Sequence, residues 1–392
     1  MDRAEFDEYV LETYKRTDLT LVKGRGSRVW DDEGNEYLDF FPGFGAGNMG
    51  HCHPAVIDAV TTQMQKIIHV PNVYYSNPQG ELAKMLVQHT FPGKVFFCNS
   101  GSEANEGAIK FARKRYKDSP GKHEIISLSN SFHGRTFGSM TATGQPKIRE
   151  GFAPLPQGFQ YCKYNDSGML ETMVNEHTAA IILEVVQGEG GIHPISAGFL
   201  KKARELCDRF DCLLILDEVQ SGIGRTARLF AYEHFDVQPD IVTMAKSLGG
   251  GLPIGAFLVR DSIPNSLTPG SHGSTFGGNA LTCAAGIAVL TTLFDHGVLA
   301  EVTPKSEYFM DKLSALQKKF PLIREIRHLG MMIGVELNKE ALPIATALRK
   351  KGILVNVTQK NVLRIMPALT VEYAELDRFV TAFKEVLMDM NQ

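Results

Sequence analysis

An aspartate and a lysine each follow a short apolar segment near the middle of the chain. Asp217 directly follows residues 212–216 (CLLIL), and Lys246 comes two residues after 241–244 (IVTM). Short, continuous apolar runs of this kind predict parallel strands that are buried on both faces. Because open α/β sheets bind ligands at the carboxyl ends of their strands, we expect the carboxylate and the amine to lie close together.

These two residue types suit one kind of chemistry. A lysine amine can bond covalently to an aldehyde cofactor, and a carboxylate can keep a ring nitrogen protonated so that the ring accepts electrons from a carbanion. Each residue alone has an ordinary explanation: Asp217 can be a helix N-cap, and Lys246 a solvated surface charge. The two together, with the motifs described below, argue for the cofactor chemistry.

A third strand end carries residues suited to binding phosphate. Residues 95–98 (VFFC) predict a strand, and NSGSE at 99–103 begins a helix that reaches about residue 117. Free backbone N–H groups, the positive end of the helix dipole and a hydroxyl group attract an anion to such a helix start. Alone, this segment would be an ordinary N-cap. Beside Lys246, we interpret it as a phosphate-binding cup.

The motif SFHGRT follows another predicted strand, 124–128. Its aromatic residue, Phe132, can stack on a flat heteroaromatic ring. Arg135 offers two parallel donors to a carboxylate. His133 could act as a general base, but a lysine at the reacting carbon makes that role unnecessary, so we favour a packing role.

Three charged residues lie in otherwise apolar or glycine-rich surroundings. Glu184 interrupts a predicted buried strand at 179–186 (AAIILEVV), and Glu189 follows it in QGEGG. A carboxylate inside such a strand costs free energy unless it is paired, so both acids are candidate site residues. Arg364 interrupts a predicted strand at 362–366, and two interpretations remain: its side chain reaches the surface, or it binds a second carboxylate.

The composition argues against several other classes of function. The chain has 392 residues and a net charge of −3, and its basic residues are dispersed, so nothing indicates a nucleic-acid partner. We expect no membrane partner either, because no segment approaches the roughly 18 apolar residues of a span. Six cysteines without CxxC spacing, and an N-terminus without an apolar signal core, favour a reduced, cytoplasmic protein. HCH at 51–53 lacks a second ligand cluster at zinc spacing, so we expect no metal site.

The elements around these motifs can be predicted from periodicity and turn residues. Residues 2–16 predict an amphipathic helix, and 28–41 predict a hairpin with its turn at Gly34. GAGNMG at 45–50 matches the letters GxGxxG, but no acidic residue lies about 20 residues downstream, so we expect a tight loop. After residue 281 the strand–helix alternation loosens, which suggests a smaller α+β domain.

Six motifs in order resemble those of the class III branch of the fold-type I aminotransferases, which depend on pyridoxal 5'-phosphate (PLP). They are NSGSEANEGAIK, SFHGRT, EVVQGEGG, LDEVQSGIGRT, MAKSLGGGLPIGA and GSTFGGN. The resemblance spans nearly the whole chain and is greatest to acetylornithine aminotransferases and their relatives. It implies an α/β fold with a large, doubly wound, mostly parallel sheet domain at 45–280. A smaller α+β domain would combine residues 1–44 and 281–392.

The resemblance also implies a reaction. The ω-amino group of an N-acylated diamino acid, N-acetylornithine foremost, would pass to 2-oxoglutarate by a ping-pong PLP mechanism in arginine or lysine biosynthesis. The substrates are small amino and 2-oxo acids, and a homodimer would share its active sites. Alternatives remain: an aminotransferase for ornithine, succinylornithine or 4-aminobutyrate, and a same-fold aminomutase or decarboxylase. A binding protein without catalysis is a further alternative, against which Asp217 and Lys246 argue.

Residue roles follow from the same resemblance. The catalytic residues would be Lys246, Asp217, Glu184 and Glu189. The cofactor would contact Ser100, Gly101, Ser102, Phe132, His133, Asp217, Val219, Gln220, Lys246 and Thr275. The substrates would contact Arg135, Ser274, Arg364 and Glu189. Thr275 would reach the phosphate bound by the partner subunit, and Glu189 would neutralise Arg364 until the carboxylate of glutamate takes its place.

Overall fold

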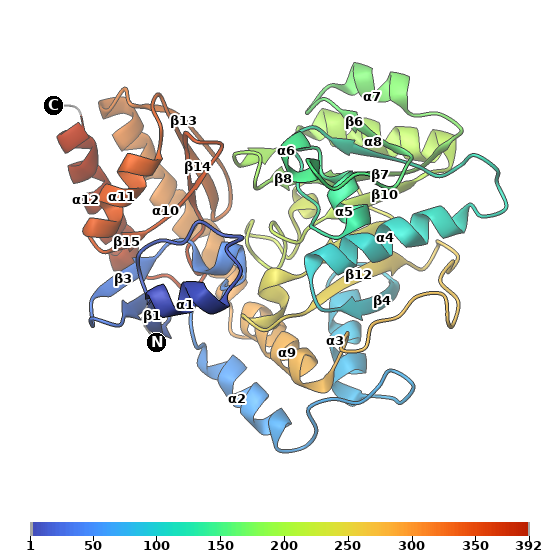
Figure 1. Ribbon diagram of the computed structural model, residues 1–392, viewed down its shortest axis with the longest axis horizontal. Coiled ribbons are helices and arrows are strands. Elements are labelled where there is room, and N and C mark those ends of the chain that lie inside the picture. Colours follow the sequence, from blue (N-terminus) through green and yellow to red (C-terminus); the bar gives the residue numbers. More distant parts are fainter. Residues whose placement is uncertain (1–2, 391–392) are drawn as a thin grey trace.

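The computed structural model describes residues 3–390. It has two parts that lie side by side (Figure 1): a large part around a seven-stranded sheet, and a smaller part formed by the two ends of the chain. Residues of the two parts meet between them, as in the contact of Arg364 with Glu189.

The large sheet has the strand order β4-β12-β11-β10-β7-β5-β6. Its members are β4 (Gly93–Cys98), β12 (Gly255–Arg260), β11 (Ile241–Met244), β10 (Leu213–Asp217), β7 (Thr178–Glu184), β5 (Glu124–Leu128) and β6 (Phe159–Cys162). β12 runs antiparallel to both of its neighbours, and the other adjacent pairs are parallel. The predicted mostly parallel, doubly wound sheet is confirmed.

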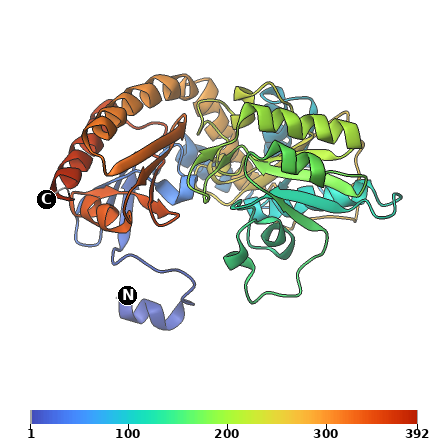
Figure 2. The same cartoon turned by 90° about the horizontal axis from the view of Figure 1, so that it is seen from above.

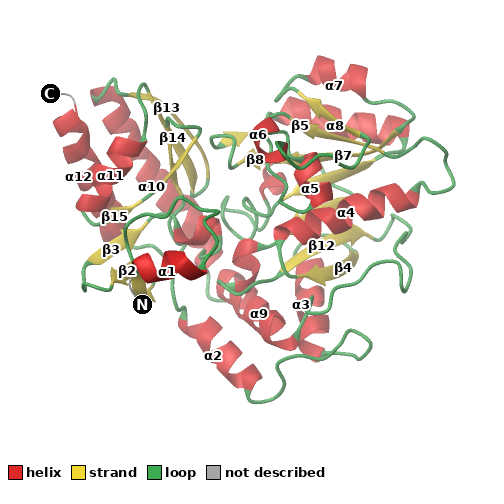
Figure 3. Ribbon diagram, in the orientation of Figure 1, coloured by secondary structure: helices red, strands yellow, loops and turns green. Residues whose placement is uncertain are grey.

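The central strands are buried on both faces because helices cover both (Figure 3). Leu214 of β10 packs in one core cluster with Leu206 of α8 (Ala197–Phe210). Its neighbour Leu213 packs in a second cluster with Phe111 of α4 (Gly101–Arg115). Successive residues of a strand point to opposite faces, so α4 and α8 lie on opposite sides of the sheet.

Shorter elements surround the large sheet or lie between it and the smaller part. They are α2 (Pro54–Met64), α3 (Asn77–Gln88), α5 (Phe137–Ala142), α6 (Pro146–Arg149), α7 (Ser167–Met173), α9 (Ala280–Phe294), the 3₁₀ helices η1 (Pro42–Gly45), η2 (Ala231–His234) and η3 (Lys246–Gly249), and the paired strands β8 (Val186–Gln187) and β9 (His193–Pro194). The GxGxxG segment forms a tight loop as predicted: Gly45 and Gly50 have φ angles of 89° and 78°.

The smaller part contains two four-stranded sheets. One has the order β1 (Leu21–Arg25), β2 (Arg28–Asp31), β3 (Glu36–Asp39) and β15 (Ile353–Leu354), and the other β13 (Ile323–Leu329), β14 (Met332–Leu337), β17 (Val362–Ile365) and β16 (Asn356–Thr358). Helices α10 (Val298–Lys319), α11 (Leu342–Lys350) and α12 (Tyr373–Met390) cover them. The parallel pair of β3 and β15 joins the two ends of the chain. The exact boundaries near residues 45 and 280 stay a prediction.

Two sequence-based predictions were wrong in detail. The N-terminal helix α1 covers only Arg3–Tyr9 of the predicted 2–16, and residue 2 lies outside the described residues. Figure 2 shows α1 standing apart from the body of the molecule. The side chains meant to share a buried face, Phe6, Val10 and Tyr14, are all exposed. A short helix without a packing partner gains little from its apolar face, so it ends early.

The second error concerns the strand predicted at 179–186. β7 ends at Glu184, and Val186 begins a separate two-residue strand. Glu184 is therefore not inside a strand but at its carboxyl end, where ligands bind.

Two further features of the described residues concern metal binding and membrane-spanning helices. Among residues 3–390 no group of three or more His, Cys, Asp or Glu side chains is arranged to hold a metal ion. No single helix of that range is long and apolar enough to cross a membrane. The pair α9 and α10, which is bent by 61°, meets the criteria of length and composition only when the two helices are taken together.

Candidate active site

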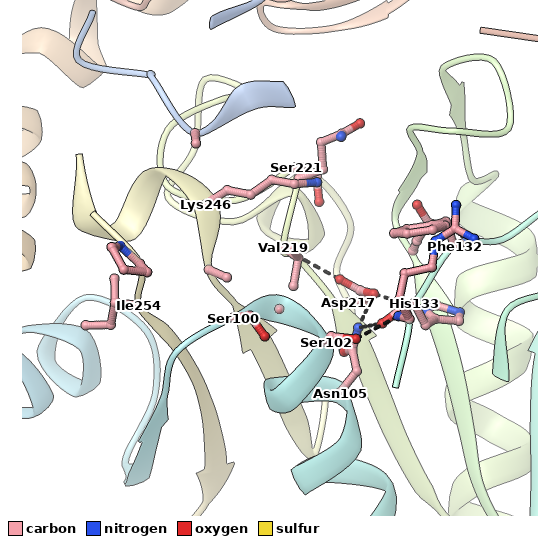
Figure 4. Close-up of a pocket in the computed structure, with 18 of the residues that line it drawn as sticks. Ser100, Ser102, Asn105, Phe132, His133, Asp217, Val219, Ser221, Lys246 and Ile254 are labelled. Carbon is pink, nitrogen blue, oxygen red and sulfur yellow. Dashed lines mark hydrogen bonds and ion pairs between the residues drawn. The ribbon is translucent and has the colours of Figure 1, made fainter. Parts of the chain in front are cut away.

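The predicted catalytic residues line one cavity of about 410 Å³ at the carboxyl edge of the large sheet (Figure 4). Asp217 ends β10 and Glu184 ends β7, and the parallel register of the two strands places these residues directly opposite each other. Lys246 begins η3, two residues after β11 on the other side of β10. The two strand-end positions predicted for Asp217 and Lys246 therefore do meet in space.

Asp217 is held by three parts of the large domain. Its Oδ2 accepts a hydrogen bond of 2.7 Å from Nδ2 of Asn105 in α4 and lies 2.8 Å from Nδ1 of His133. Its Oδ1 accepts from the backbone N–H of Val219 at 3.0 Å. An ionised carboxylate only accepts hydrogen bonds, so Nδ1 of His133 carries the proton. His133 thus orients Asp217 in addition to packing.

Glu184 is buried but has hydrogen-bond partners. Its carboxylate accepts from the backbone N–H of Phe132 at 2.8 Å and from that of Gly188 at 3.2 Å. Burial raises the pKa of Glu184 to about 7, although nearby His133 and the two N–H groups act in the opposite direction. The acid therefore fixes the backbone that carries the Phe132 ring.

Lys246 has an unusual backbone conformation. Its φ angle is 43°, in the left-handed region, and Ser247 anchors the following turn by donating its hydroxyl proton to the carbonyl of Gly45. Burial lowers the pKa of the Lys246 amine, which raises the fraction of neutral amine at neutral pH. The neutral amine is the nucleophilic form.

The start of α4 is the segment for which the sequence predicts a phosphate-binding cup. Ser100 is the N-cap, and its hydroxyl accepts from the N–H of Glu103 at 3.2 Å. A Cβ on Gly101 would lie 2.5 Å from Cγ1 of Val219, so only glycine allows this close approach. The first N–H groups of a helix have no partner within it and can bind an anion.

Ser102 has partners that the sequence did not suggest. Its Oγ accepts from the backbone N–H groups of Arg135 at 2.8 Å and Thr136 at 3.2 Å, and it lies 2.9 Å from Oγ of Ser139. Ser102 therefore ties the helix start to the loop that carries Arg135. The Arg135 side chain is exposed, with its guanidinium 5.5 Å from the centre of the Phe132 ring.

Arg364 lies inside the molecule, so its interpretation as a surface residue is wrong. It is 1% exposed, and its Nη1 donates to Oε1 of Glu189 at 2.6 Å. Its Nε and Nη2 donate to Oδ1 of Asn356 at 3.1 and 2.8 Å. Gln220 accepts from Nη1 at 3.4 Å and donates to the carbonyl of Phe44 at 3.3 Å.

Three predicted site residues do not line the cavity of this chain: Ser274, Thr275 and Arg364, which lies behind Glu189. Ser274 uses its hydroxyl to accept from Nδ2 of Asn99 at 3.2 Å, and Thr275 is exposed. Conversely, the sequence analysis missed Asn105 and Asn356. Asn105 had a signal, since it is a polar residue next to Ala104 on the buried side of α4. Asn356 had none, because its importance depends on strand register.

The residues present fit PLP. The cavity offers an amine at Lys246, a carboxylate at Asp217 and a glycine-lined helix start at Gly101, matching the aldehyde, ring nitrogen and phosphate of that cofactor. Figure 4 shows Lys246 and Phe132 on opposite sides of the cavity with Asp217 between them.

Comparison with known proteins decides the family. The family model for class III aminotransferases matches residues 9–387. The chain belongs to the class III aminotransferases. It is 49% identical over 386 residues to an acetylornithine aminotransferase from Caldanaerobacter subterraneus subsp. tengcongensis, with 98% of each chain covered. It is 42% identical over 394 residues to a succinylornithine transaminase from Photorhabdus laumondii, with 99% of this chain and 98% of that one covered.

Solved structures of class III aminotransferases agree in fold. The ornithine aminotransferase from Toxoplasma gondii superposes with a TM-score of 0.95 at 34% identity, covering 99% of this chain and 94% of that one. A second structure of that enzyme, with a TM-score of 0.94, is described as having PLP at partial occupancy in its active site. Class III aminotransferases depend on PLP, so this protein is a PLP-dependent transaminase of the fold-type I architecture.

Proposed function

We propose that the protein transfers the ω-amino group of an N-acylated diamino acid, N-acetylornithine foremost, to 2-oxoglutarate. The observation that carries this proposal is the 2.6 Å contact between Glu189, which lines the cavity together with Arg135, and Arg364, which is buried behind Glu189. The names of the relatives, acetylornithine aminotransferase and succinylornithine transaminase, support the same substrate class.

Lys246 and Asp217 perform the chemistry common to both half-reactions. Bound PLP supplies an electron sink for the carbanion formed at the substrate carbon. Lys246 would hold the cofactor aldehyde covalently, and its amine, once freed, would carry the proton taken from the substrate carbon. Asp217, kept in place by His133 and Asn105, would keep the ring nitrogen protonated. Phe132, whose backbone Glu184 fixes, would cover the ring.

Glu189 and Arg364 let one site accept two unlike amino donors. Glutamate brings an α-carboxylate next to its reacting amine, whereas the ω-amino substrate brings none. An arginine left unpaired in a desolvated site is costly. Glu189 neutralises Arg364 while the ω-amino substrate is bound and moves aside for the carboxylate of glutamate. Arg135, at the exposed rim, holds the far carboxylate of either substrate.

A donor panel tests the proposal. The half-reaction of the holoenzyme is followed by cofactor absorbance with N-acetylornithine, N-succinylornithine, free ornithine and 4-aminobutyrate. We expect the highest kcat/KM with N-acetylornithine, and product only when 2-oxoglutarate is present. Turnover without a 2-oxo acid would instead indicate an aminomutase or decarboxylase. A higher kcat/KM for free ornithine would assign the ornithine reaction.

We also propose a homodimer with shared active sites. Thr275 is exposed and does not line this chain's own cavity, and three consecutive exposed apolar residues, Val73, Tyr74 and Tyr75, offer a surface for a second copy. Mixing inactive Lys246→Ala protomers with Thr275→Ala protomers should restore activity, because one site of each mixed dimer has both residues. No recovery in mixtures that do form dimers would contradict a shared site.

The place of the reaction in the cell is part of the proposal. All six cysteines are free thiols, five of them buried, which is typical of proteins from a reducing compartment such as the cytoplasm. A role in arginine biosynthesis follows from the proposed substrate. Expression of the chain should restore growth without arginine to a bacterial strain that lacks its acetylornithine-transaminating enzymes, and Lys246→Ala should not.

A further inference from the structure

Strand register places an asparagine opposite the buried arginine. β16 and β17 are antiparallel, and Asn356 pairs directly with Arg364 across them. Side chains at directly opposed positions lie on the same face of a sheet and touch each other. On the other side of Arg364 the register places Gly334, where a Cβ would lie 2.8 Å from Cβ of Ile192. Arg364 therefore has a side-chain neighbour on only one of its flanking strands.

The amide of Asn356 holds one edge of the guanidinium. Its Oδ1 accepts from both Nε and Nη2 of Arg364, at 3.1 and 2.8 Å. The ring of Phe41 covers one face, with its centre 4.6 Å from Cζ of Arg364. Nη1 remains on the opposite edge, and it donates to Glu189. The contacts with Asn356 and Phe41 do not depend on where the Glu189 side chain lies.

The side chain of Asn356 is neutral, and this affects the charge that Arg364 can offer to a substrate. Among the residues that the hydrogen bonds of Arg364 reach, Glu189 is acidic, whereas Asn356 and Gln220 are neutral. A carboxylate at position 356 would neutralise Arg364 permanently and compete with an incoming substrate carboxylate. A neutral acceptor fixes the same geometry and leaves the positive charge available.

We propose that Asn356 is a positioning residue of the carboxylate clamp, which holds Arg364 in its binding conformation in both half-reactions without neutralising it. This inference rests on the proposed function of Glu189 and Arg364. When Glu189 moves aside, the side chain of Arg364 would otherwise be free to follow it or to change rotamer. The two hydrogen bonds to Asn356 prevent both movements, so that Nη1 stays directed at the substrate site.

The test compares the two half-reactions of the holoenzyme in three variants. N-acetylornithine is the donor, 2-oxoglutarate is the acceptor, and cofactor absorbance reports each half separately. Asn356→Ala should raise the KM for 2-oxoglutarate on the order of tenfold, because hydrogen bonds to a charged group are strong. The donor half-reaction should change less than twofold. Asn356→Asp, which keeps the side-chain shape, should raise the same KM by neutralising Arg364.

Asn361→Ala is the matched control. Asn361 follows the same hairpin turn, and its amide donates at 3.4 Å to Glu336 and to the carbonyl of Leu337, away from Arg364. It should leave both half-reactions as in the wild type. Equal losses in both halves for Asn356→Ala and Asn356→Asp would indicate a structural role and overturn the proposal. An unchanged KM for 2-oxoglutarate in both variants would overturn it too.

A double variant separates this inference from the function on which it rests. In Glu189→Ala the donor half-reaction should be slow, since Arg364 is then unpaired. Adding Asn356→Asp should restore it at least severalfold, because a fixed carboxylate replaces the movable one, while 2-oxoglutarate stays poorly bound. No restoration would contradict the role of Asn356. If instead the wild-type holoenzyme did not transaminate N-acetylornithine, the proposed function itself would be wrong.

Discussion

Oδ2 of Asp217 lies 2.8 Å from Nδ1 of His133, and both side chains are buried. The contact joins the end of β10 to the loop that also carries Phe132 and Arg135. The carboxylate proposed to face the ring nitrogen and the residues proposed to cover the ring and bind substrate are thus parts of one hydrogen-bonded unit. Loss of one of these residues should therefore slow the chemical step of the reaction and not only weaken substrate binding.

His133→Ala should slow proton abstraction in both half-reactions on the order of tenfold, since it removes a hydrogen bond to a charged group. The cofactor should remain covalently bound, because Lys246 is untouched. Stopped-flow absorbance with N-acetylornithine and with glutamate measures the two rates. His234→Ala serves as a control, because His234 contacts a backbone carbonyl of Thr226 and does not line the cavity. Unchanged rates for His133→Ala would show that Asp217 needs no such support.

Lys246→Ala should abolish covalent retention of the cofactor and essentially all turnover. The measurement is borohydride reduction followed by peptide mass spectrometry, which finds the cofactor mass on the peptide containing residue 246 in the wild type alone. Lys246→Arg keeps a positive charge but lacks a nucleophilic amine at ordinary pH, so it should fail as well. Turnover near the wild-type rate in either variant would refute the assignment.

The variants of the clamp residues should differ in which half-reaction they impair. Glu189→Ala leaves Arg364 positively charged, so it should favour glutamate and weaken the ω-amino donor. Arg364→Ala should raise the KM for glutamate and 2-oxoglutarate, by roughly 10- to 100-fold for a lost charge-assisted pair. Arg135→Ala should impair both halves. The two half-reactions are measured separately by cofactor absorbance, and equal losses in both for Glu189→Ala would exclude the switch.

Much of the fold and site could be predicted because local patterns determined them. The apolar strands before Asp217 and Lys246 are short and buried on both faces, and their carboxyl ends must share one edge of a parallel sheet. The helix start at Gly101 follows from residue types that begin a helix. Each of these inferences needs only neighbouring residues.

The parts that failed depend on distant contacts. The helix predicted at 2–16 has the right periodicity, but within a single chain its apolar face has no surface to pack against. Glu184 was assigned to the strand interior because no turn residue marks the end of β7. The role of Asn356 requires the register between β16 and β17, which single-strand patterns do not contain.

A buried acid next to the site makes stability depend on pH. Glu218 is fully buried; its Oε2 accepts from Oγ of Ser221 at 2.5 Å and its Oε1 from the N–H of Tyr232 at 2.8 Å. Burial raises its pKa to about 7, although these hydrogen bonds oppose the shift. Below the ordinary pKa of 4.5 the acid is protonated whether the chain is folded or unfolded, and above 7 it is ionised in both. Between these values the folded chain binds more protons.

The contribution of Glu218 to the free energy of unfolding therefore falls by up to about 3 kcal/mol as the pH rises from about 4.5 to 7. Glu218→Gln cannot ionise, and its amide group can still accept from Tyr232 and donate to Ser221. The variant should therefore gain stability relative to the wild type as the pH rises from 5 to 8. Urea denaturation midpoints at the two pH values measure this difference, with Glu307→Gln as the exposed control. Parallel pH dependences of wild type and Glu218→Gln would show that Glu218 does not titrate in this range.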